Sequence, residues 1–149
     1  MDILVAEADA DLATAYRQFL AHYGFDVTTA SGGLDCLALL RHWFPAVVAL
    51  DLDLLWGGAD GVLEHLRHQQ PRQRLPAVIL TGQVPEEQLP AWLLTSPVVK
   101  YMCKPFRSSE LLQSIRGCMG GAREDAAAGE TTQQGQASDG TVLSRSREK

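Results

Sequence analysis

The segment Ala46–Asp51, with the sequence Ala-Val-Val-Ala-Leu-Asp, constrains the fold more than any other part of the chain. It is a short apolar run with two adjacent β-branched residues. Such a run predicts a strand that is buried on both faces, as the strands of a parallel sheet are. The run ends on a carboxylate, and open α/β sheets bind their ligands at the carboxyl ends of the strands. Asp51 is therefore the first candidate for a functional residue.

The composition limits the class of protein. With 149 residues, 46% of them hydrophobic, the chain is long enough for one domain with a sizeable core. The formal net charge of −5 argues against non-specific binding to nucleic acid. We see no signal peptide and no run of the roughly 18 apolar residues that a membrane span needs. The three cysteines are far apart, which favours reduced thiols and a cytoplasmic protein. From the charge and the missing apolar run we expect no nucleic-acid and no membrane partner.

Short apolar segments alternate along the chain with segments of helical periodicity. The predicted strands are residues 3–6, 25–30, 46–51, 76–81 and 98–102, and the predicted helices are about residues 12–23, 34–43, 62–68, 85–95 and 108–119. In the second helix, Leu34, Leu37 and Leu40 are expected to face the core, with Cys36 as a further candidate. The alternation predicts an α/β fold with a doubly wound, five-stranded parallel sheet, covered by helices on both faces.

In two parts of the chain the residue types disfavour regular helices or strands. Pro90 lies inside the predicted helix 85–95, so we expect that helix to be short, kinked or displaced. From Gly120 onward, small, polar and charged residues dominate, and Val142 and Leu143 are the only large apolar residues. Such a segment cannot bury enough surface to offset the entropy of ordering it. We therefore expect one folded domain at residues 1–119 and a disordered polar tail at residues 120–149.

Polar residues follow several of the predicted strands. In a doubly wound sheet the carboxyl ends of the strands lie side by side, so these residues are expected to gather around Asp51. Clustered oxygen ligands suit Mg²⁺, which neutralises an incoming phosphoryl group and lets a carboxylate act as a nucleophile. The candidates are Glu7 and Asp9 after the first strand, Asp51 and Asp53 at the third, Thr81 at the fourth and Lys104 after the fifth.

Taken together and in this order, the segments at the strand ends resemble the receiver domain of two-component response regulators. The resemblance covers about residues 2–119 and implies the flavodoxin-like (βα)5 receiver fold. It also implies phosphorelay signal transduction by a signalling module that is not an enzyme. The matching segments are Ile3–Asp9, Leu50–Leu52, Asp60–Gly61, Leu80–Gly82 and Tyr101–Phe106.

The resemblance assigns a role to each residue of the predicted site. Asp51 accepts a phosphoryl group from a histidine kinase or a phosphotransfer protein. Thr81 hydrogen-bonds a phosphoryl oxygen, and Lys104 pairs with the phosphoryl group. Mg²⁺ is bound by Glu7, by Asp51 and by the backbone carbonyl of Asp53.

The resemblance also implies a switch and an output surface. Tyr101, three residues before Lys104, is the aromatic side chain that turns inward when Thr81 moves. The surface of the fourth helix, the fifth strand and the fifth helix then reports the phosphorylated state. We expect no effector domain, so the implied output is contact with a downstream protein partner.

Two features differ from the usual receiver pattern. The family usually has two adjacent acidic residues after the first strand, and here Ala8 stands in the second position. The loop from Asp51 to Asp60 is longer than usual and lacks the expected proline. The first difference predicts weakened or absent Mg²⁺ binding. It supports a second hypothesis, a pseudo-receiver that acts as a phosphorylation-independent interaction module.

Simpler interpretations stay open for several residues. Asp9 suits the N-cap of the following helix better than a metal site, Glu7 suits a solvated loop, and Tyr101 suits the core. A third class of function is a small flavodoxin-like enzyme or cofactor-binding protein. No glycine-rich phosphate loop follows the first strand, which disfavours that class.

Overall fold

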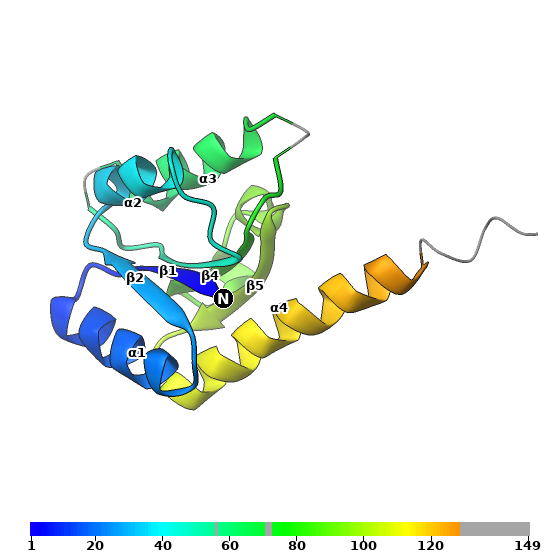
Figure 1. Ribbon diagram of the computed structural model, residues 1–149. Coiled ribbons are helices and arrows are strands. Elements are labelled where there is room, and N and C mark those ends of the chain that lie inside the picture. Colours follow the sequence, from blue (N-terminus) through cyan, green and yellow to red (C-terminus); the bar gives the residue numbers. More distant parts are fainter. Residues whose placement is uncertain (56, 71–72, 129–149) are drawn as a thin grey trace, which may run out of the picture.

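The apolar segments form the strands of a single parallel sheet, ordered β2-β1-β3-β4-β5 (Figure 1). The computed structural model describes residues 1–55, 57–70 and 73–128. The order confirms the doubly wound, flavodoxin-like fold, in which β1 and β3 lie next to each other at the topological switch point. The strands are β1 (Asp2–Ala6), β2 (Asp26–Ala30), β3 (Val47–Asp51), β4 (Ala77–Gly82) and β5 (Val98–Cys103).

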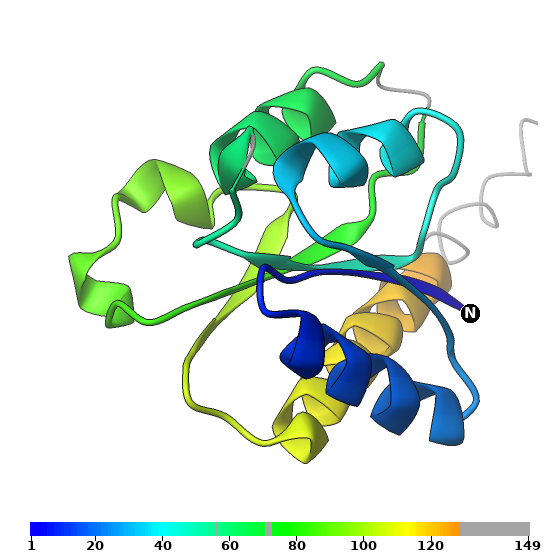
Figure 2. The same cartoon turned by 90° about the vertical axis from the view of Figure 1, so that its left-hand side faces the viewer.

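Helices cover both faces of this sheet. Figure 2 shows α1 (Ala10–His22) and α4 (Ser108–Ala128) on one face, and α2 (Gly33–Leu40) and α3 (Gly58–Arg67) on the other. No helix among the described residues is long and apolar enough to cross a lipid bilayer.

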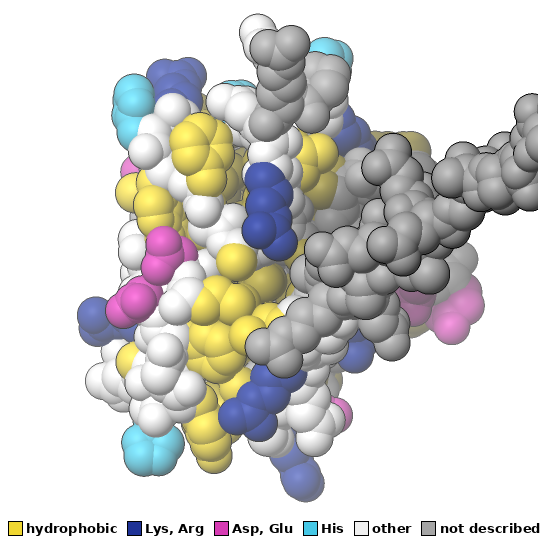
Figure 3. Space-filling model, turned by 45° about the vertical axis from the view of Figure 1, so that its right-hand side comes forward, with side chains coloured by type: hydrophobic (Ala, Val, Ile, Leu, Met, Phe, Trp, Pro, Cys, Tyr) yellow, Lys and Arg dark blue, Asp and Glu magenta, His cyan; other side chains and the backbone are white. Residues whose placement is uncertain are grey.

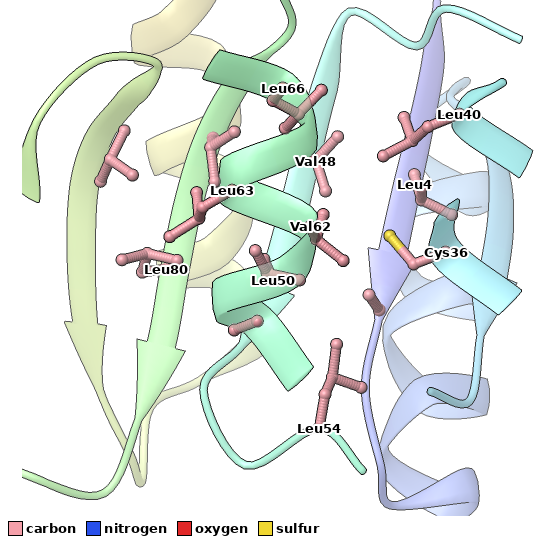
Figure 4. Close-up of a cluster of buried hydrophobic side chains, with 14 of the residues drawn as sticks. Leu4, Cys36, Leu40, Val48, Leu50, Leu54, Val62, Leu63, Leu66 and Leu80 are labelled. Atoms are coloured by element: carbon pink, nitrogen blue, oxygen red, sulfur yellow. The ribbon is translucent and has the colours of Figure 1, made fainter. Parts of the chain in front are cut away.

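The two faces bury alternate residues of the same strands. Along β1, Leu4 packs with the α2 and α3 side, whereas Ile3 and Val5 pack with the α1 and α4 side. This alternation is the two-residue period of a strand, and both faces are apolar because both are covered. Figure 4 shows the first cluster, in which Leu63 of α3 lies over Leu80 of β4. The sheet is thus fixed from both sides, which holds the ends of its strands in place.

Helix α1 begins and ends where the sequence predicts. Asp9 is the N-cap, and its side chain accepts hydrogen bonds from the backbone N–H groups of Asp11 and Leu12, both at 3.0 Å. After the C-cap, Gly24 adopts a φ of 86°, a left-handed conformation that glycine adopts without a steric penalty. The prediction that Asp9 caps this helix is therefore confirmed.

Helix α2 corrects one prediction. Cys36 and Leu40 are buried, but Leu34 is 60% exposed. The helix begins at Gly33, which places Leu34 in its first turn on the outer side. The periodicity of leucines alone does not distinguish this register from one with Leu34 inside.

Two short 3₁₀ helices replace a regular helix between β4 and β5. They are η1 (Glu86–Gln88) and η2 (Ala91–Leu94), and Pro90 lies between them. Proline has no N–H to donate and favours an extended conformation in the residue before it, and Leu89 has a ψ of 140°. Arg67, at the end of α3, donates hydrogen bonds to the backbone oxygens of Trp92 and Ser96. These bonds hold η2 and the residues after it against the end of α3. The expectation of a short or broken helix is confirmed.

Helix α4 continues to Ala128 instead of ending near Met119. The Gly120–Gly121 pair predicts a stop, but the residues that follow it include Ala122, Arg123 and Glu124, which are strong helix formers. Of the tail predicted to be disordered, residues 120–149, the part up to Ala128 belongs to α4, and residues 129–149 lie outside the described residues.

Apolar side chains are also exposed on the surface (Figure 3). A groove of about 600 Å³ includes Asp2, Val47 and Ala77, the first residues of β1, β3 and β4. It therefore lies at the amino ends of the strands, opposite the end that carries the predicted site. Its exposed apolar lining consists of Met1, Phe44, Leu75 and Met119.

Candidate functional site

The carboxyl ends of four strands bring the predicted polar residues together. Asp51 is the last residue of β3 and pairs in register with Thr81 of β4. Glu7 directly follows β1, the strand on the other side of β3. Lys104 directly follows β5, and its backbone N–H donates to Gly82 at 2.7 Å. Glu7, Asp51, Thr81 and Lys104 therefore share one end of the sheet, as the strand-end rule predicts.

Asp51 is buried and fixed by its neighbours. Only 1% of the residue is exposed. Its Oδ1 accepts a hydrogen bond from the backbone N–H of Asp53 at 3.0 Å. Its Oδ2 lies 3.4 Å from the Nζ of Lys104. One carboxylate oxygen is thus oriented by the loop after β3, and the other faces a positive charge.

Lys104 contacts two carboxylates at once. Its ammonium donates a hydrogen bond to Oε2 of Glu7 at 2.8 Å in addition to its contact with Asp51. Burial alone would lower the pKa of Lys104, but the hydrogen bond to Glu7 and the negative charge of Asp51 outweigh it and raise the pKa. Lys104 therefore stays protonated and provides a permanent positive charge between Glu7 and Asp51.

Glu7 is buried, with 3% of the residue exposed. Its second oxygen, Oε1, accepts a hydrogen bond from the backbone N–H of Asp9 at 3.1 Å. Burial raises the pKa of Glu7, the bonds from Lys104 and Asp9 oppose the rise, and the nearby Asp51 adds to it. The interpretation of Glu7 as a solvated loop acid is therefore wrong. The sequence gives no local signal for its pairing with Lys104, because the two residues are 97 positions apart.

Thr81 of β4 pairs with Asp51, and Tyr101 lies one strand further on, in β5. Thr81 is 5% exposed, and its backbone oxygen accepts a hydrogen bond from the N–H of Leu52 at 2.8 Å. Tyr101 is 7% exposed, and its hydroxyl donates to the backbone oxygen of Val84. Gly82 makes room for this ring, since a Cβ at that position would lie 3.0 Å from the tyrosine hydroxyl. Tyr101 is turned inward here, and its role as a switch stays a prediction.

The two remaining acidic candidates lie at the edge of this cluster. Asp9 is exposed, and its Oδ1 is engaged in the two capping bonds of α1. Asp53 is also exposed, and it contributes its backbone N–H to Asp51. Neither side chain adds a buried carboxylate to the cluster.

The fold and this cluster define an open α/β domain of CheY-like architecture with a buried aspartate at the end of its third strand. The chain belongs to the response regulator receiver domain family, since the model of that family matches residues 3–116. It is a receiver domain of two-component signalling, a signalling module rather than an enzyme. The resemblance noted from the strand-end segments is confirmed.

Relatives agree with this assignment. The chain is 32% identical over 117 residues to "Probable transcriptional regulatory protein TcrX" of Mycobacterium tuberculosis, covering 78% of this chain and 49% of the relative. It is 29% identical over 119 residues to "Probable transcriptional regulator ycf27" of Porphyra purpurea, covering 78% of this chain and 46% of the relative. The chain thus spans about half the length of these curated relatives.

Solved structures show the same fold. A CheY-like receiver domain protein from Methanospirillum hungatei superposes with a TM-score of 0.74 at 19% identity, covering 83% of this chain and 97% of that chain. The receiver domain of the Francisella response regulator 1452 gives a TM-score of 0.70 at 24% identity, covering 78% and 94%.

Receiver domains typically bind Mg²⁺, but the cluster in this chain does not fit such an ion between Glu7 and Asp51. One oxygen of each carboxylate accepts a backbone hydrogen bond. The other oxygen of each lies next to the ammonium of Lys104, at 2.8 Å for Glu7 and 3.4 Å for Asp51. Ala8, the residue after Glu7, supplies no carboxylate. Within the described part of the chain, no group of three or more His, Cys, Asp or Glu residues is arranged to hold a metal ion.

Proposed function

We propose that Asp51 accepts a phosphoryl group from a phosphohistidine of a histidine kinase or a phosphotransfer protein. The observation that carries this proposal is the contact of 3.4 Å between Oδ2 of Asp51 and the ammonium of Lys104. In the transfer, a carboxylate oxygen of Asp51 forms a bond to phosphorus while the bond from phosphorus to the donor imidazole nitrogen breaks. Lys104 neutralises charge on the phosphoryl oxygens, and the hydroxyl of Thr81 donates to one of them.

The proposed output is contact with a downstream protein. Phosphorylation places a dianionic group beside Thr81 and Lys104, and both residues connect directly to β4 and β5. The neighbouring surface consists of η1, η2, β5 and α4, which correspond to the predicted fourth helix, fifth strand and fifth helix. Its exposed apolar residues include Trp92 and Val99. The proposal places the chain in the cytoplasm and requires no contact with nucleic acid or membrane.

Treatment with acetyl phosphate tests the proposal. The intact mass of the full chain is expected to rise by one phosphoryl group, both with and without Mg²⁺ in parallel samples. Asp51→Asn is expected to abolish the rise, because an amide cannot form the acyl phosphate. Asp53→Asn is the matched control, since Asp53 is exposed and lies two residues away. Equal labelling of the wild type and Asp51→Asn would refute Asp51 as the acceptor.

A phosphorylation-independent interaction module is the second candidate function. It is favoured by Ala8 and by the ion pair of 2.8 Å between Glu7 and Lys104, which already engages the lysine. For such a module, no mass gain is expected from acetyl phosphate or from a phosphorylated kinase. Binding to its partner is then expected to be the same for the wild type and Asp51→Asn.

A further inference from the structure

We infer that Lys104 is the built-in counter-cation of the strand-end cluster and takes the place that a divalent cation has elsewhere in the family. The inference concerns the proposed acceptor site but does not require that phosphotransfer occurs. In the wild type, the Lys104 ammonium already contacts both carboxylates, so that a metal ion enters only when Lys104 is removed or a further carboxylate is added.

The contacts of the two carboxylates support this inference. Oε1 of Glu7 and Oδ1 of Asp51 accept backbone hydrogen bonds from Asp9 and Asp53. The other two oxygens, Oε2 of Glu7 and Oδ2 of Asp51, lie 2.8 Å and 3.4 Å from the same Nζ atom of Lys104. Mg²⁺ requires oxygen ligands at about 2.0–2.1 Å in a nearly octahedral arrangement. An ion that bridged these two oxygens would therefore have to displace the ammonium.

Burial makes the counter-cation necessary. Glu7 and Asp51 are 3% and 1% exposed, and two buried carboxylates close together are costly unless a positive charge accompanies them. Lys104 supplies that charge from a side chain that is itself only 14% exposed. The cluster of two carboxylates and one ammonium then carries a single excess negative charge.

The residue after Glu7, Ala8, also supports the inference. It follows Glu7 directly and is exposed, so the position beside the cluster holds a methyl group where the family has a metal-binding acid. Since no third carboxylate attracts a cation, nothing at this position competes with Lys104. An aspartate at position 8 would provide that ligand without disturbing a buried contact.

Titration of the metal-free full chain with Mn²⁺, followed by the relaxation of water protons, measures cation binding without any phosphoryl donor. The wild type is expected to show no saturable binding up to millimolar Mn²⁺. Lys104→Met, which removes the ammonium, is expected to bind Mn²⁺ saturably, at least about tenfold more tightly than the millimolar limit up to which the wild type shows no saturation. Ala8→Asp is expected to gain affinity while its fold is unchanged. The matched controls are Lys100→Met and Ala10→Asp, both at exposed positions, and they are expected to behave as the wild type does.

Two outcomes would overturn the inference. One is tight, saturable binding of Mn²⁺ by the wild type. The other is a gain in Ala8→Asp with none in folded Lys104→Met, which would make the missing carboxylate the sole cause. Should Lys104→Met not fold, the NMR signal of the Lys104 ammonium decides in the wild type. We expect it to be unchanged by millimolar Mg²⁺, whereas a saturable shift would refute the inference. Failure of Asp51 to accept a phosphoryl group would leave all these results unaffected.

Discussion

At the residue scale, Glu7 makes the stability of the protein depend on pH. Burial raises its pKa in the folded state above the ordinary value of 4.5. Between the unfolded and the folded pKa the folded state binds more protons, so the free energy of unfolding falls as the pH rises through this interval. We expect the wild type to lose stability relative to Glu7→Gln as the pH rises from about 4.5 through the folded-state pKa of Glu7. Urea unfolding in metal-free buffer, followed by tryptophan fluorescence, measures the difference.

The raised pKa of Lys104 does not interfere with this measurement. The stability that it contributes is complete below its unfolded value of 10.5 and is lost only as the pH rises through the higher folded value. The Glu7 effect lies well below that range. Stability curves for the wild type and Glu7→Gln that run parallel from acidic to neutral pH would contradict the burial argument.

At the scale of single elements, Asp9 stabilises helix α1 as a cap. Its Oδ1 satisfies the N–H groups of Asp11 and Leu12, which have no partner within the helix. We expect Asp9→Ala to lower the free energy of unfolding by about 0.5–2 kcal/mol. Asp9→Asn is expected to keep most of the stability, because asparagine caps helices as well as aspartate does. If both variants lose the same stability in urea unfolding, the charge of Asp9 matters and not its capping bonds.

Packing of the helices against the sheet gives a second prediction at this scale. Leu63 of α3 is fully buried in the cluster that contains Leu50 and Leu80, so we expect Leu63→Ala to cost about 2–5 kcal/mol. Leu34→Ala removes a side chain that is 60% exposed and is expected to cost no more than about 0.5 kcal/mol. Urea midpoints of the two variants provide the comparison. A large cost at Leu34 would show that this residue belongs to the core after all.

At the scale of the whole molecule, the sequence predicts the sheet and the position of the site well. Apolar runs such as Ala46–Asp51 have few alternatives to buried strands, and parallel strands necessarily bring their carboxyl ends together. Asp51, Thr81 and Lys104 could therefore be placed side by side from their position after each strand alone.

Three other features do not follow from the apolar pattern of the sequence. The register of α2, which exposes Leu34, follows from where the helix begins. The length of α4 depends on helix formers that outweigh the Gly120–Gly121 pair. The burial of Glu7 depends on its hydrogen bond with Lys104, and these two residues meet only because of the order of the strands in the complete sheet. For Glu7 the prediction from a single segment fails because the decisive partner is distant in sequence.

The central claim is that Asp51 is the acceptor, and borohydride trapping tests it most directly. An aspartyl phosphate is reduced by borohydride to homoserine, so the site of phosphorylation is recorded as a change in one residue. After reaction with acetyl phosphate and reduction, peptide mass spectrometry is expected to find homoserine at position 51 and not at position 53. Unmodified Asp51 under conditions that convert the aspartate of a control receiver domain, or homoserine at another position, would contradict the account.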